Sequence, residues 1–350
     1  MNTQVEPLLG YLSEKALAGN LLTEFVEWQG WQIEPIIGGY NNLLYHARSK
    51  EHDWAIKFTR RDARDRAGRE YTALKMLQAL NLHLAPQAVY LNRDDYIYPV
   101  VVQTWLDGKV QQTPPQTDEE WRELLRCMVA LHKITPDSAN SSTIHGVGHI
   151  PPATLSMYCA ANGLARIRQQ VAQIPVTSYP DEVATIVNRI QRDPFPDWPR
   201  PISSFCHVDP NTLNFVRTPQ TWLVVDWENS GWGDPAFEIA DLMSHPAYMD
   251  VPEDRWPWVV EQYCQMSRTP EASERIWVYY RLMIVWWVVR FLRYVIESEH
   301  HQQPVTDPAL AQQFSQRLAL RPVDDVAVMR RKYDYYCTLA ITQTGKTMLQ

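Results

Sequence analysis

Several features are scarce in this 350-residue chain, and each scarcity argues against a class of protein. The five cysteines are scattered, odd in number and without CxxC spacing, which disfavours a disulfide framework or a zinc site and favours reduced thiols. The ten histidines form no HExxH pattern. The net charge of -7 offers no global basic field to a nucleic acid or an anionic membrane, so we expect neither as a partner.

Long hydrophobic runs are also absent. The most apolar stretch, 282–289, lies between two arginines and is far too short to span a bilayer, which indicates a buried helix. The N-terminus has no basic region followed by an apolar core, so no signal peptide is predicted. We expect a cytoplasmic protein that is a monomer or a homodimer.

The pattern of the chain changes near residue 103. Helical spacing at 7–28 predicts a helical N-terminal extension, assigned to residues 1–28. In residues 29–105 the apolar residues fall in short β-type runs, as in a small, mostly antiparallel sheet that carries one helix. Residues 106–350 have mainly helical patterns. The expectation is an α+β fold with a β-rich N-terminal lobe, a larger helical C-terminal lobe and a hinge at 103–110.

Individual elements follow from the same patterns. The predicted strands are 32–37, 43–47, 54–58, 88–91 and 97–103, and the predicted helices are 65–80, 119–134, 164–174, 181–190 and 273–297. A proline-rich connector at 193–201 leads into further short strands.

The most informative stretch lies beyond that connector. Asp209 is followed by Asn214 and, after apolar residues, by Asp226. One carboxylate can accept the proton of an attacking hydroxyl, while an amide and a second carboxylate supply the oxygen ligands that Mg²⁺ prefers. The order is typical of a phosphoryl-transfer site. The alternative is a hairpin with polar residues at its turn, but HxDxxxxN with a following apolar-Asp-Trp-Glu is rarer than either part alone.

Upstream residues suit the phosphates of a nucleotide. Gly38 and Gly39 would let backbone N–H groups approach a phosphate, although such a turn usually only joins a hairpin. Lys57 ends a β-type run, and Glu70 follows in a predicted helix, where it can pair with Lys57. The alternatives are an exposed strand-end lysine and a solvated helix residue. The basic cluster from Lys57 to Arg69 either serves phosphate or forms a solvated helix face.

Together these pieces resemble the aminoglycoside phosphotransferase and choline kinase family, whose fold is similar to that of protein kinases. The matching pieces cover well over half of the chain and identify the family more sharply than a member. They are Gly38-Gly39-x-x-Asn42-x-x-Tyr45, Ile56-Lys57, Arg69-Glu70, Ala130-Leu131-His132, His207-x-Asp209-x4-Asn214, Val225-Asp226-Trp227-Glu228, and Gly233-Asp234-Pro235 with Glu238.

The resemblance implies a bilobal, protein-kinase-like fold and an enzyme that uses ATP and Mg²⁺. The γ-phosphoryl group would pass to a hydroxyl of a small, amine-bearing acceptor. By resemblance, Asp209 is the catalytic base, and Asn214 and Asp226 bind Mg²⁺. Glu70 would orient Lys57, and 103–106 would receive the adenine. The residues implied at the nucleotide are Gly38, Gly39, Asn42, Lys57, Glu70, Gln103 and Trp105.

The chain departs from the family pattern at three positions. Val208 stands where most relatives have glycine, which is acceptable if the backbone there stays in an ordinary region. Glu238 replaces a common aspartate, but Asp234 and the following proline still predict a capped helix start. Asn211 stands where many protein kinases have lysine. The short link from Asp226 to that helix leaves no room for an activation segment, which also argues against a protein kinase.

Some residues near the motifs have more than one interpretation. His207 is expected to hold backbone groups, and His132 to be a packed structural residue. Glu228 either approaches the metal or substrate, or bonds to nearby backbone. A catalytically silent, nucleotide-binding pseudokinase or regulatory module is the alternative function, although Lys57 and Asp209 are both present, as are the two predicted metal ligands.

The acceptor site is expected among aromatic and acidic residues of the helical lobe, because aromatic faces with carboxylates suit a cationic amine. The alternative, favoured for any single aromatic residue, is a place in the core. The candidates are Trp256, Trp258, Trp277, Tyr279, Tyr280, Trp286, Trp287 and Tyr294, with Asp250, Glu253, Asp254 and Glu261.

Overall fold

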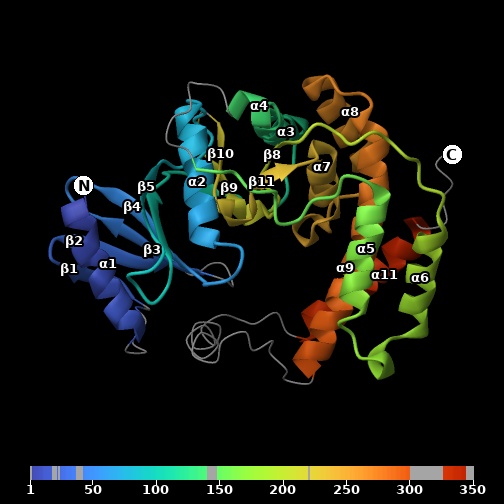
Figure 1. Cartoon of the computed structure of the whole chain (residues 1–350), viewed down its shortest axis with the longest axis horizontal. Coiled ribbons are helices and arrows are strands. Elements are labelled where there is room, and N and C mark those ends of the chain that lie inside the picture. The colour runs from blue at the N-terminus through green and yellow to red at the C-terminus, as the bar shows by residue number, and fades with distance from the viewer. Residues whose placement is uncertain are drawn as a thin grey trace.

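A β-rich part and a mainly helical part lie side by side along the long axis of the computed structural model (Figure 1). The structure describes residues 2–17, 22, 24–36, 42–139, 148–219, 221–299 and 326–343. The predicted α+β, bilobal class is confirmed.

The N-terminal lobe is built on one antiparallel sheet with strand order β1-β2-β3-β4-β6-β5. Its strands are β1 (Val26–Trp28), β2 (Trp31–Ile36), β3 (Asn42–Arg48), β4 (Asp53–Thr59), β5 (Ala88–Asn92) and β6 (Val100–Thr104). Helix α1 (Asn2–Leu17) covers one face and α2 (Arg66–Ala79) packs against β4, β5 and β6. All five strands predicted in this region form, with small shifts at their ends.

Alternation along β4 decides which residues face the site. Ile56 and Phe58 enter the core that contains α1. Ala55 and Lys57 therefore point to the opposite face, because successive side chains of a strand alternate. In the neighbouring strand, Gln103 pairs with Ala55 and shares that face.

The predicted helix at 7–28 is wrong over its last part, where 26–28 form strand β1. Val26 pairs with Ile33 of β2, and the two strands are joined through Gln29 and Gly30. Both joining residues have positive φ, 46° and 82°, as a tight hairpin turn requires. The turn chemistry therefore outweighs the helical spacing.

The C-terminal lobe is mainly helical. Its helices are α3 (Asp118–His132), α4 (Pro136–Ala139), α5 (Ala160–Val171), α6 (Asp181–Arg192), α7 (Pro235–Ser244), α8 (Trp256–Ser267), α9 (Ala272–Glu299) and α11 (Val326–Gln343). Its short 3₁₀ helices are η1 (Val176–Ser178), η2 (Thr212–Asn214), η3 (Trp227–Asn229), η4 (Pro246–Tyr248) and η5 (Glu253–Arg255). The longest predicted helices at 119–134 and 273–297 are confirmed as α3 and α9.

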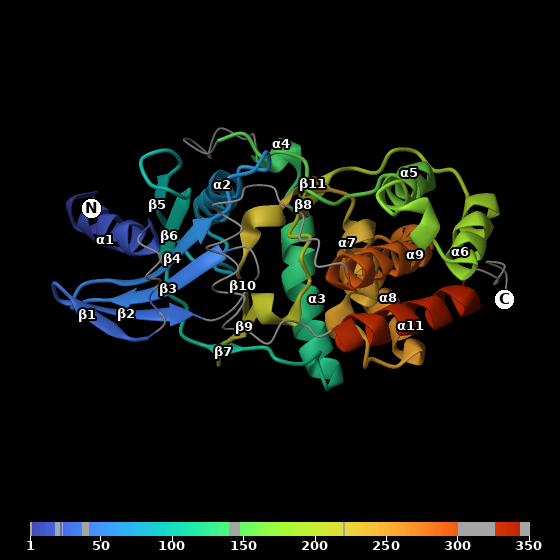
Figure 2. The ribbon, with the colours of Figure 1, turned by 90° about the horizontal axis from the view of Figure 1, so that it is seen from below.

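Helix α9 organises the packing of this lobe. It contacts α5, α7 and α11, and Figure 2 shows these helices gathered around it. Six of the apolar residues at 282–289 are fully buried there, as predicted, and Trp286 and Trp287 are partly buried. Within the described residues, the search for a helix long and apolar enough to cross a membrane finds no candidate.

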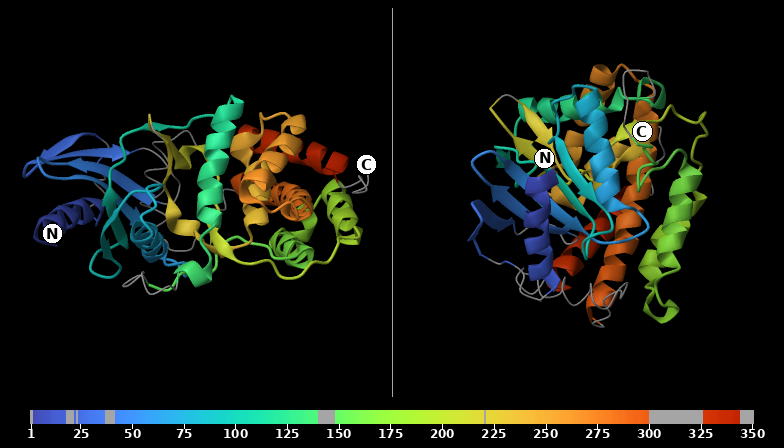
Figure 3. Two further views of the ribbon diagram at one scale, coloured as in Figure 1. Left: turned by 90° about the horizontal axis from the view of Figure 1, so that it is seen from above. Right: turned by 60° about the vertical axis from the view of Figure 1, so that its left-hand side comes forward.

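Two small sheets lie between the lobes and carry the motif residues. One contains β7 (Lys109–Val110), β9 (Phe215–Arg217) and β10 (Trp222–Val224), and the other pairs β8 (Ser204–Cys206) with β11 (Gly231–Gly233). Figures 2 and 3 show α3 passing between these strands and the helices at the far end of the lobe. Helix α2 of the N-terminal lobe packs against η3, so the loop after β10 meets the N-terminal lobe directly.

Candidate active site

Lys57 lies at the centre of a group of carboxylates where the two lobes meet. Its ammonium group is 2.7 Å from Glu70 Oε2, forms an ion pair with Asp226 and lies 3.6 Å from Glu228 Oε2. The side chain is buried, which alone would lower its pKa, but the three carboxylates raise the pKa of Lys57 well above its usual value. The lysine therefore stays charged, and the alternative of an exposed strand-end lysine is wrong.

Glu70 is held by helix α2, which begins behind an Asp65 cap whose carboxylate accepts from the Gly68 N–H. Glu70 is fully buried in this helix and faces β4 through its bond to Lys57. Burial raises the pKa of Glu70 to about 7, against the opposing effect of Lys57. The alternative of a solvated helix residue is therefore wrong.

The loop after β8 is fixed by a carboxylate from α7. One oxygen of Glu238 accepts the N–H groups of His207 and Val208, at 2.8 and 2.7 Å. The other oxygen lies 2.5 Å from His132 Nε2, whose second ring nitrogen is 3.0 Å from the Tyr263 hydroxyl. The predicted structural role of buried His132 is confirmed.

His207 also behaves as predicted, because its ring holds backbone. Its Nε2 donates to the Val225 carbonyl at 2.9 Å, which ties the loop after β8 to the loop after β10. The predicted cap of α7 is present too: the Asp234 carboxylate accepts from the Ala236 N–H, and Pro235 occupies the first helical position.

Val208 does not stay in an ordinary backbone region, so that expectation is wrong. Its φ is 58°, in the left-handed region that disfavours residues with a Cβ by roughly 1–2 kcal/mol. The physical reason is the double contact with Glu238, which accepts two successive N–H groups and so fixes the turn. Strain at a loop of this kind persists only where the surroundings over-determine it.

Asp209, Asn214 and Asp226 are brought together by short backbone links. The Asn214 amide donates to the Asp209 carbonyl at 3.1 Å, and the Val225 N–H donates to the Asn214 carbonyl at 2.9 Å. Asn229 Nδ2 lies 3.4 Å from Asp209 Oδ2. The three motif residues thus converge beside Lys57, although they come from two separate loops.

The two aspartates differ in their acidity. Burial and the charge of Asp226 raise the pKa of Asp209 to about 6. Burial also acts to raise the pKa of Asp226, but Lys57 outweighs it and lowers that pKa. Asp209 is therefore the more basic of the two carboxylates, as a proton acceptor should be.

Asn214 and Asp226 fit the oxygen chemistry of a hard divalent cation. The Asn214 side-chain nitrogen is used in the bond to Asp209, which leaves the side-chain oxygen Oδ1 for a metal ion. Lys57 engages one oxygen of Asp226, which leaves the second. A second close group of oxygen ligands, Glu70, Asp226 and Glu228, surrounds the ammonium of Lys57, which already compensates its charge.

Three arginines before and within the first turns of α2 bind successive residues of the loop after β10. Arg66 pairs with Glu228, Arg64 Nη1 lies 3.4 Å from Asn229 Oδ1, and Arg69 donates to the Ser230 carbonyl at 2.8 Å. We call Arg64, Arg66 and Arg69 the arginine clasp. It joins the two lobes at the loop that carries Asp226.

The clasp revises the expectations for the basic cluster and for Glu228. Arg66 is buried, so this part of the cluster is not a solvated helix face, and it binds a carboxylate instead of serving phosphate. Glu228 bonds to side chains of the other lobe, Arg66 and Asn42, with Asn42 Nδ2 at 2.9 Å, and within the described residues it makes no bond to nearby backbone. The clasp is not recognisable in the sequence, where its only signal is the spacing of the arginines before Glu70.

Besides Lys57 and Glu70, the residues expected at the nucleotide divide into three groups. Gly38 and Gly39 lie outside the described residues. Asn42 and Gln103 are buried, and Gln103 lies on the sheet face that carries Lys57, with its Oε1 lacking a partner among the described residues. Trp105 donates its backbone N–H to the Asp53 carbonyl at 2.9 Å and stacks on a histidine, so this N–H is already used within the lobe.

Three of the eight aromatic residues expected at the acceptor are buried in the core, and the other five are partly buried and pack against it. Trp256, Tyr279 and Tyr280 are at most 1% exposed. Glu253 accepts from the Tyr280 hydroxyl at 2.9 Å and from Trp256 Nε1 at 3.3 Å, so it is a partner for core residues. For these residues the core alternative is correct.

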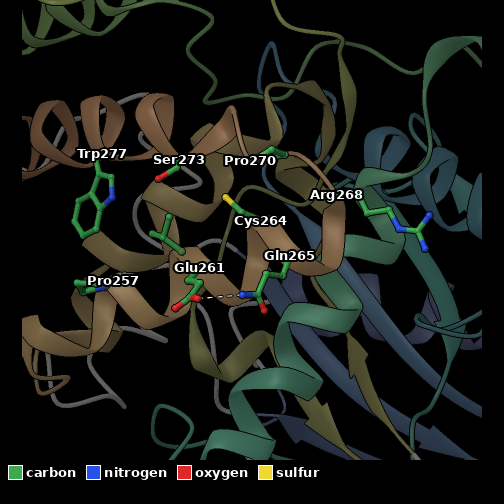
Figure 4. Close-up of a pocket in the computed structure, with 9 residues that line it drawn as sticks. Pro257, Glu261, Cys264, Gln265, Arg268, Pro270, Ser273 and Trp277 are labelled. Atoms are coloured by element: carbon green, nitrogen blue, oxygen red, sulfur yellow. Dashed lines mark hydrogen bonds between the residues drawn. The ribbon is translucent and has the colours of Figure 1, made fainter.

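A hollow between α8 and α9 has a volume of about 570 Å³ (Figure 4). Its lining includes Trp277 and Glu261, and Glu261 accepts a hydrogen bond from Gln265 at 3.0 Å. Its lining contains none of the predicted catalytic, nucleotide or metal residues. This hollow therefore lies away from the phosphoryl-transfer site.

Solved structures of kinases share this fold. The chain is 18% identical to a choline/ethanolamine kinase family protein from Mesorhizobium loti, with a TM-score of 0.52 over 95% of this chain and 99% of the other. It is 12% identical to choline kinase from Cryptosporidium parvum Iowa II, with a TM-score of 0.56 over 97% of this chain and 98% of the other. It is also 12% identical to a spectinomycin phosphotransferase solved in complex with ADP and spectinomycin, with a TM-score of 0.52 over 87% of this chain and 93% of the other.

A comparison with curated proteins gives no match. The sequence model of the phosphotransferase enzyme family, in contrast, matches residues 32–277, which contain all the motif residues described above. The match agrees with the geometry, in which a buried lysine, its glutamate and the Asp–Asn–Asp set converge from separate segments. The chain belongs to the phosphotransferase enzyme family, here called APH.

Proposed function

We propose that this protein is an ATP- and Mg²⁺-dependent small-molecule kinase that transfers the γ-phosphoryl group to a hydroxyl of an amine-bearing acceptor. The observation that carries the proposal is the buried contact of Lys57 with both Glu70 and Asp226, next to Asp209. Phosphoryl transfer needs positioning and charge stabilisation more than covalent chemistry from the protein, and this set supplies both.

Each residue has a role that its surroundings support. Lys57, held by Glu70, would contact the nucleotide phosphates, with residues 29–105 forming the nucleotide lobe. Asn214 and Asp226 would hold Mg²⁺, which neutralises phosphate charge when bound. Asp209 would orient the acceptor hydroxyl and take its proton, and Asn229, 3.4 Å from its carboxylate, would help to keep it in place.

The helical lobe, residues 106–350, would supply the acceptor site. An amine-bearing acceptor is supported by the similar structures, which include choline, ethanolamine and spectinomycin kinases.

The test measures acceptor-dependent ADP release from ATP with Mg²⁺ across choline, ethanolamine, other amino alcohols and amino sugars. Asp209→Asn keeps the shape of the side chain but removes the base. We expect its kcat to fall about 10²–10⁴-fold, while nucleotide binding by calorimetry is retained. Asp137→Asn, which changes an exposed carboxylate of the same lobe outside the candidate acceptor residues, is the matched control and should keep wild-type turnover.

Two results would contradict the proposal. Undiminished turnover in Asp209→Asn would remove this residue as the base. ATP binding without ADP release for any acceptor would favour the pseudokinase alternative.

A further inference from the structure

Gln103 is a buried amide on the face of the sheet that carries Lys57. The residue is 5% exposed, and its Oε1 has no hydrogen-bond partner among the described residues. The next residue of β6 differs, because the Thr104 N–H donates to the Gln87 carbonyl at 3.0 Å and Thr104 Oγ1 accepts from the Gln87 N–H at 2.9 Å. Burying a polar group without a partner is unfavourable, so Gln103 has unused bonding capacity for a ligand.

The strand register places Gln103 between Lys57 and the connection of the two lobes. Val101 lies opposite Lys57, and Gln103 lies opposite Ala55, two positions earlier in β4. Two residues of a strand span roughly 7 Å. Strand β6 ends at Thr104, where the chain crosses towards the C-terminal lobe. The amide of Gln103 therefore lies one step of the strand pair away from the lysine, on the side of this crossing.

The other side of Lys57 is closed by groups of the protein. There Asn42 pairs with the last residue of β4, and its Nδ2 donates to Glu228 of the other lobe at 2.9 Å. On the side of the crossing, the same sheet face presents only the methyl group of Ala55 and the amide of Gln103 from these two strands. A nucleotide whose phosphates contact Lys57 is therefore expected to place its base beside Ala55 and Gln103.

An amide side chain can satisfy both of its polar groups on adenine, but not on guanine or hypoxanthine. Adenine has an N6 amino donor next to its N7 acceptor, and these match the amide oxygen and the amide nitrogen. Guanine and hypoxanthine have a carbonyl oxygen at position 6, so both neighbouring groups are acceptors. Turning the amide over does not help, because one of its two ends is always an acceptor. The buried amide of Gln103 therefore matches adenine alone among these bases.

We propose that Gln103 selects the base of the nucleotide, by accepting a hydrogen bond from the 6-amino group of adenine through Oε1 and donating one to N7 through Nε2. The inference rests on the proposed function and narrows it, because it makes the protein selective for ATP over GTP and ITP. Gln103 is then a specificity residue for the phosphoryl donor, while Lys57 contacts the phosphates that all three nucleotides share.

The binding test uses nucleoside diphosphates, so it needs no acceptor. Calorimetry should show that wild type binds ADP about 10–100-fold more tightly than IDP, which carries a carbonyl oxygen at position 6. 7-Deaza-ADP, which keeps the amino group but lacks the N7 acceptor, should also bind more weakly than ADP. Gln103→Met keeps the length of the side chain but removes both polar groups. It should reduce the preference for ADP over IDP by about 10-fold or more, and bind ADP and 7-deaza-ADP equally.

Gln78→Met is the matched control, because it replaces an exposed amide of α2 by the same residue. It should keep the wild-type order of affinities for the three nucleotides. Gln103→Leu provides a second apolar variant, and thermal melting verifies that each variant folds. Both Gln103 variants remove an unpaired buried polar group, so we expect them to be at least as stable as wild type.

Turnover separates this inference from the proposed function. With an acceptor that is phosphorylated, the ratio of kcat/KM for ATP to that for ITP should fall in Gln103→Met by the same factor as the ratio of affinities. A base preference that is lost in Gln103→Met, with no turnover for any acceptor, would contradict the proposed function alone.

Two outcomes would overturn the role of Gln103. One is equal binding of ADP and IDP to the wild-type protein. The other is a preference for ADP that is unchanged in both Gln103→Met and Gln103→Leu.

Discussion

The lobe junction and the end of α7 differ in whether their buried polar groups have bonding partners. At the junction, Lys57 contacts carboxylates from two separate segments, and Glu228 is bonded to Arg66 and Asn42. At the end of α7, Asp241 has no such partner in the described residues. Asp209 interacts with charges of both regions, so the contrast occurs around one residue.

The difference affects charge as well as bonding. Nucleotide phosphates and a metal ion are common to all reactions of a kinase, so the groups that handle them can be pre-positioned by partners within the chain. At Asp241, burial, followed by the nearby charges of Asp209 and Glu238, raises the pKa well above its usual value. A buried carboxyl without a partner lowers the stability of the folded protein.

The largest effect on this comparison should come from breaking the arginine clasp. Arg66→Met leaves Glu228 buried without its guanidinium, and removing one partner of a buried ion pair typically destabilises by about 3–5 kcal/mol. The double variant Arg66→Met/Glu228→Gln should lose less than the sum of the single variants, because neither charge is then left alone. Urea unfolding of the four proteins measures this coupling.

Arg64→Met is the matched control for the clasp. The Arg64 side chain is 41% exposed and contacts the same loop at the longer distance of 3.4 Å, so its loss should change stability by no more than about 0.5 kcal/mol. Equal effects for the Arg64 and Arg66 variants would show that the buried pair does not hold the lobes together.

The sequence predicted the junction well because its chemistry depends on residue types in a fixed order. Lys57, Glu70, Asp209, Asn214 and Asp226 could be named from spacing and from the family pattern, and the structure brings them together. The strands and helices that carry them were also predictable, since each has a clear apolar period.

The remaining features depend on contacts between distant segments, which no local pattern reveals. Arg66 and Glu228 are 162 positions apart, so their pairing follows only from the packing of α2 on η3. The left-handed conformation of Val208 follows from a carboxylate 30 positions away. Asp241 was not singled out because its significance is the absence of a partner, which requires all its neighbours to be placed.

A smaller effect should appear in the pH dependence of stability at the end of α7. The pKa of Asp241 is raised in the folded state, so its favourable contribution is complete below the unfolded pKa and is lost as pH rises through the folded value. Asp241→Asn does not titrate. Its stability relative to wild type should therefore increase from acid to mildly alkaline pH, by roughly 1 kcal/mol for an unsatisfied buried group.

Urea unfolding at several pH values measures this difference. The groups that face Asp241 and titrate themselves, Asp209, Glu238 and Tyr336, remain in both proteins. Asp250→Asn, in which an exposed carboxylate is removed, should show no comparable trend. A difference between Asp241→Asn and wild type that does not vary with pH would mean that the carboxyl is paired in solution.

The smallest effect tests how firmly the junction is determined. At Val208, alanine keeps the left-handed penalty of about 1–2 kcal/mol, which glycine avoids at a cost of about 0.5–1 kcal/mol in unfolded-chain entropy. Val208→Gly should therefore be more stable than Val208→Ala by up to about 1 kcal/mol. Val100, another buried valine but within strand β6, should show the usual order of stability, in which the alanine variant is more stable than the glycine variant.

Denaturant midpoints of the four variants measure the order of stability at both positions. The same order at both positions would mean that Glu238 does not force the left-handed turn, and that the junction is less fixed by its partners than its contacts indicate.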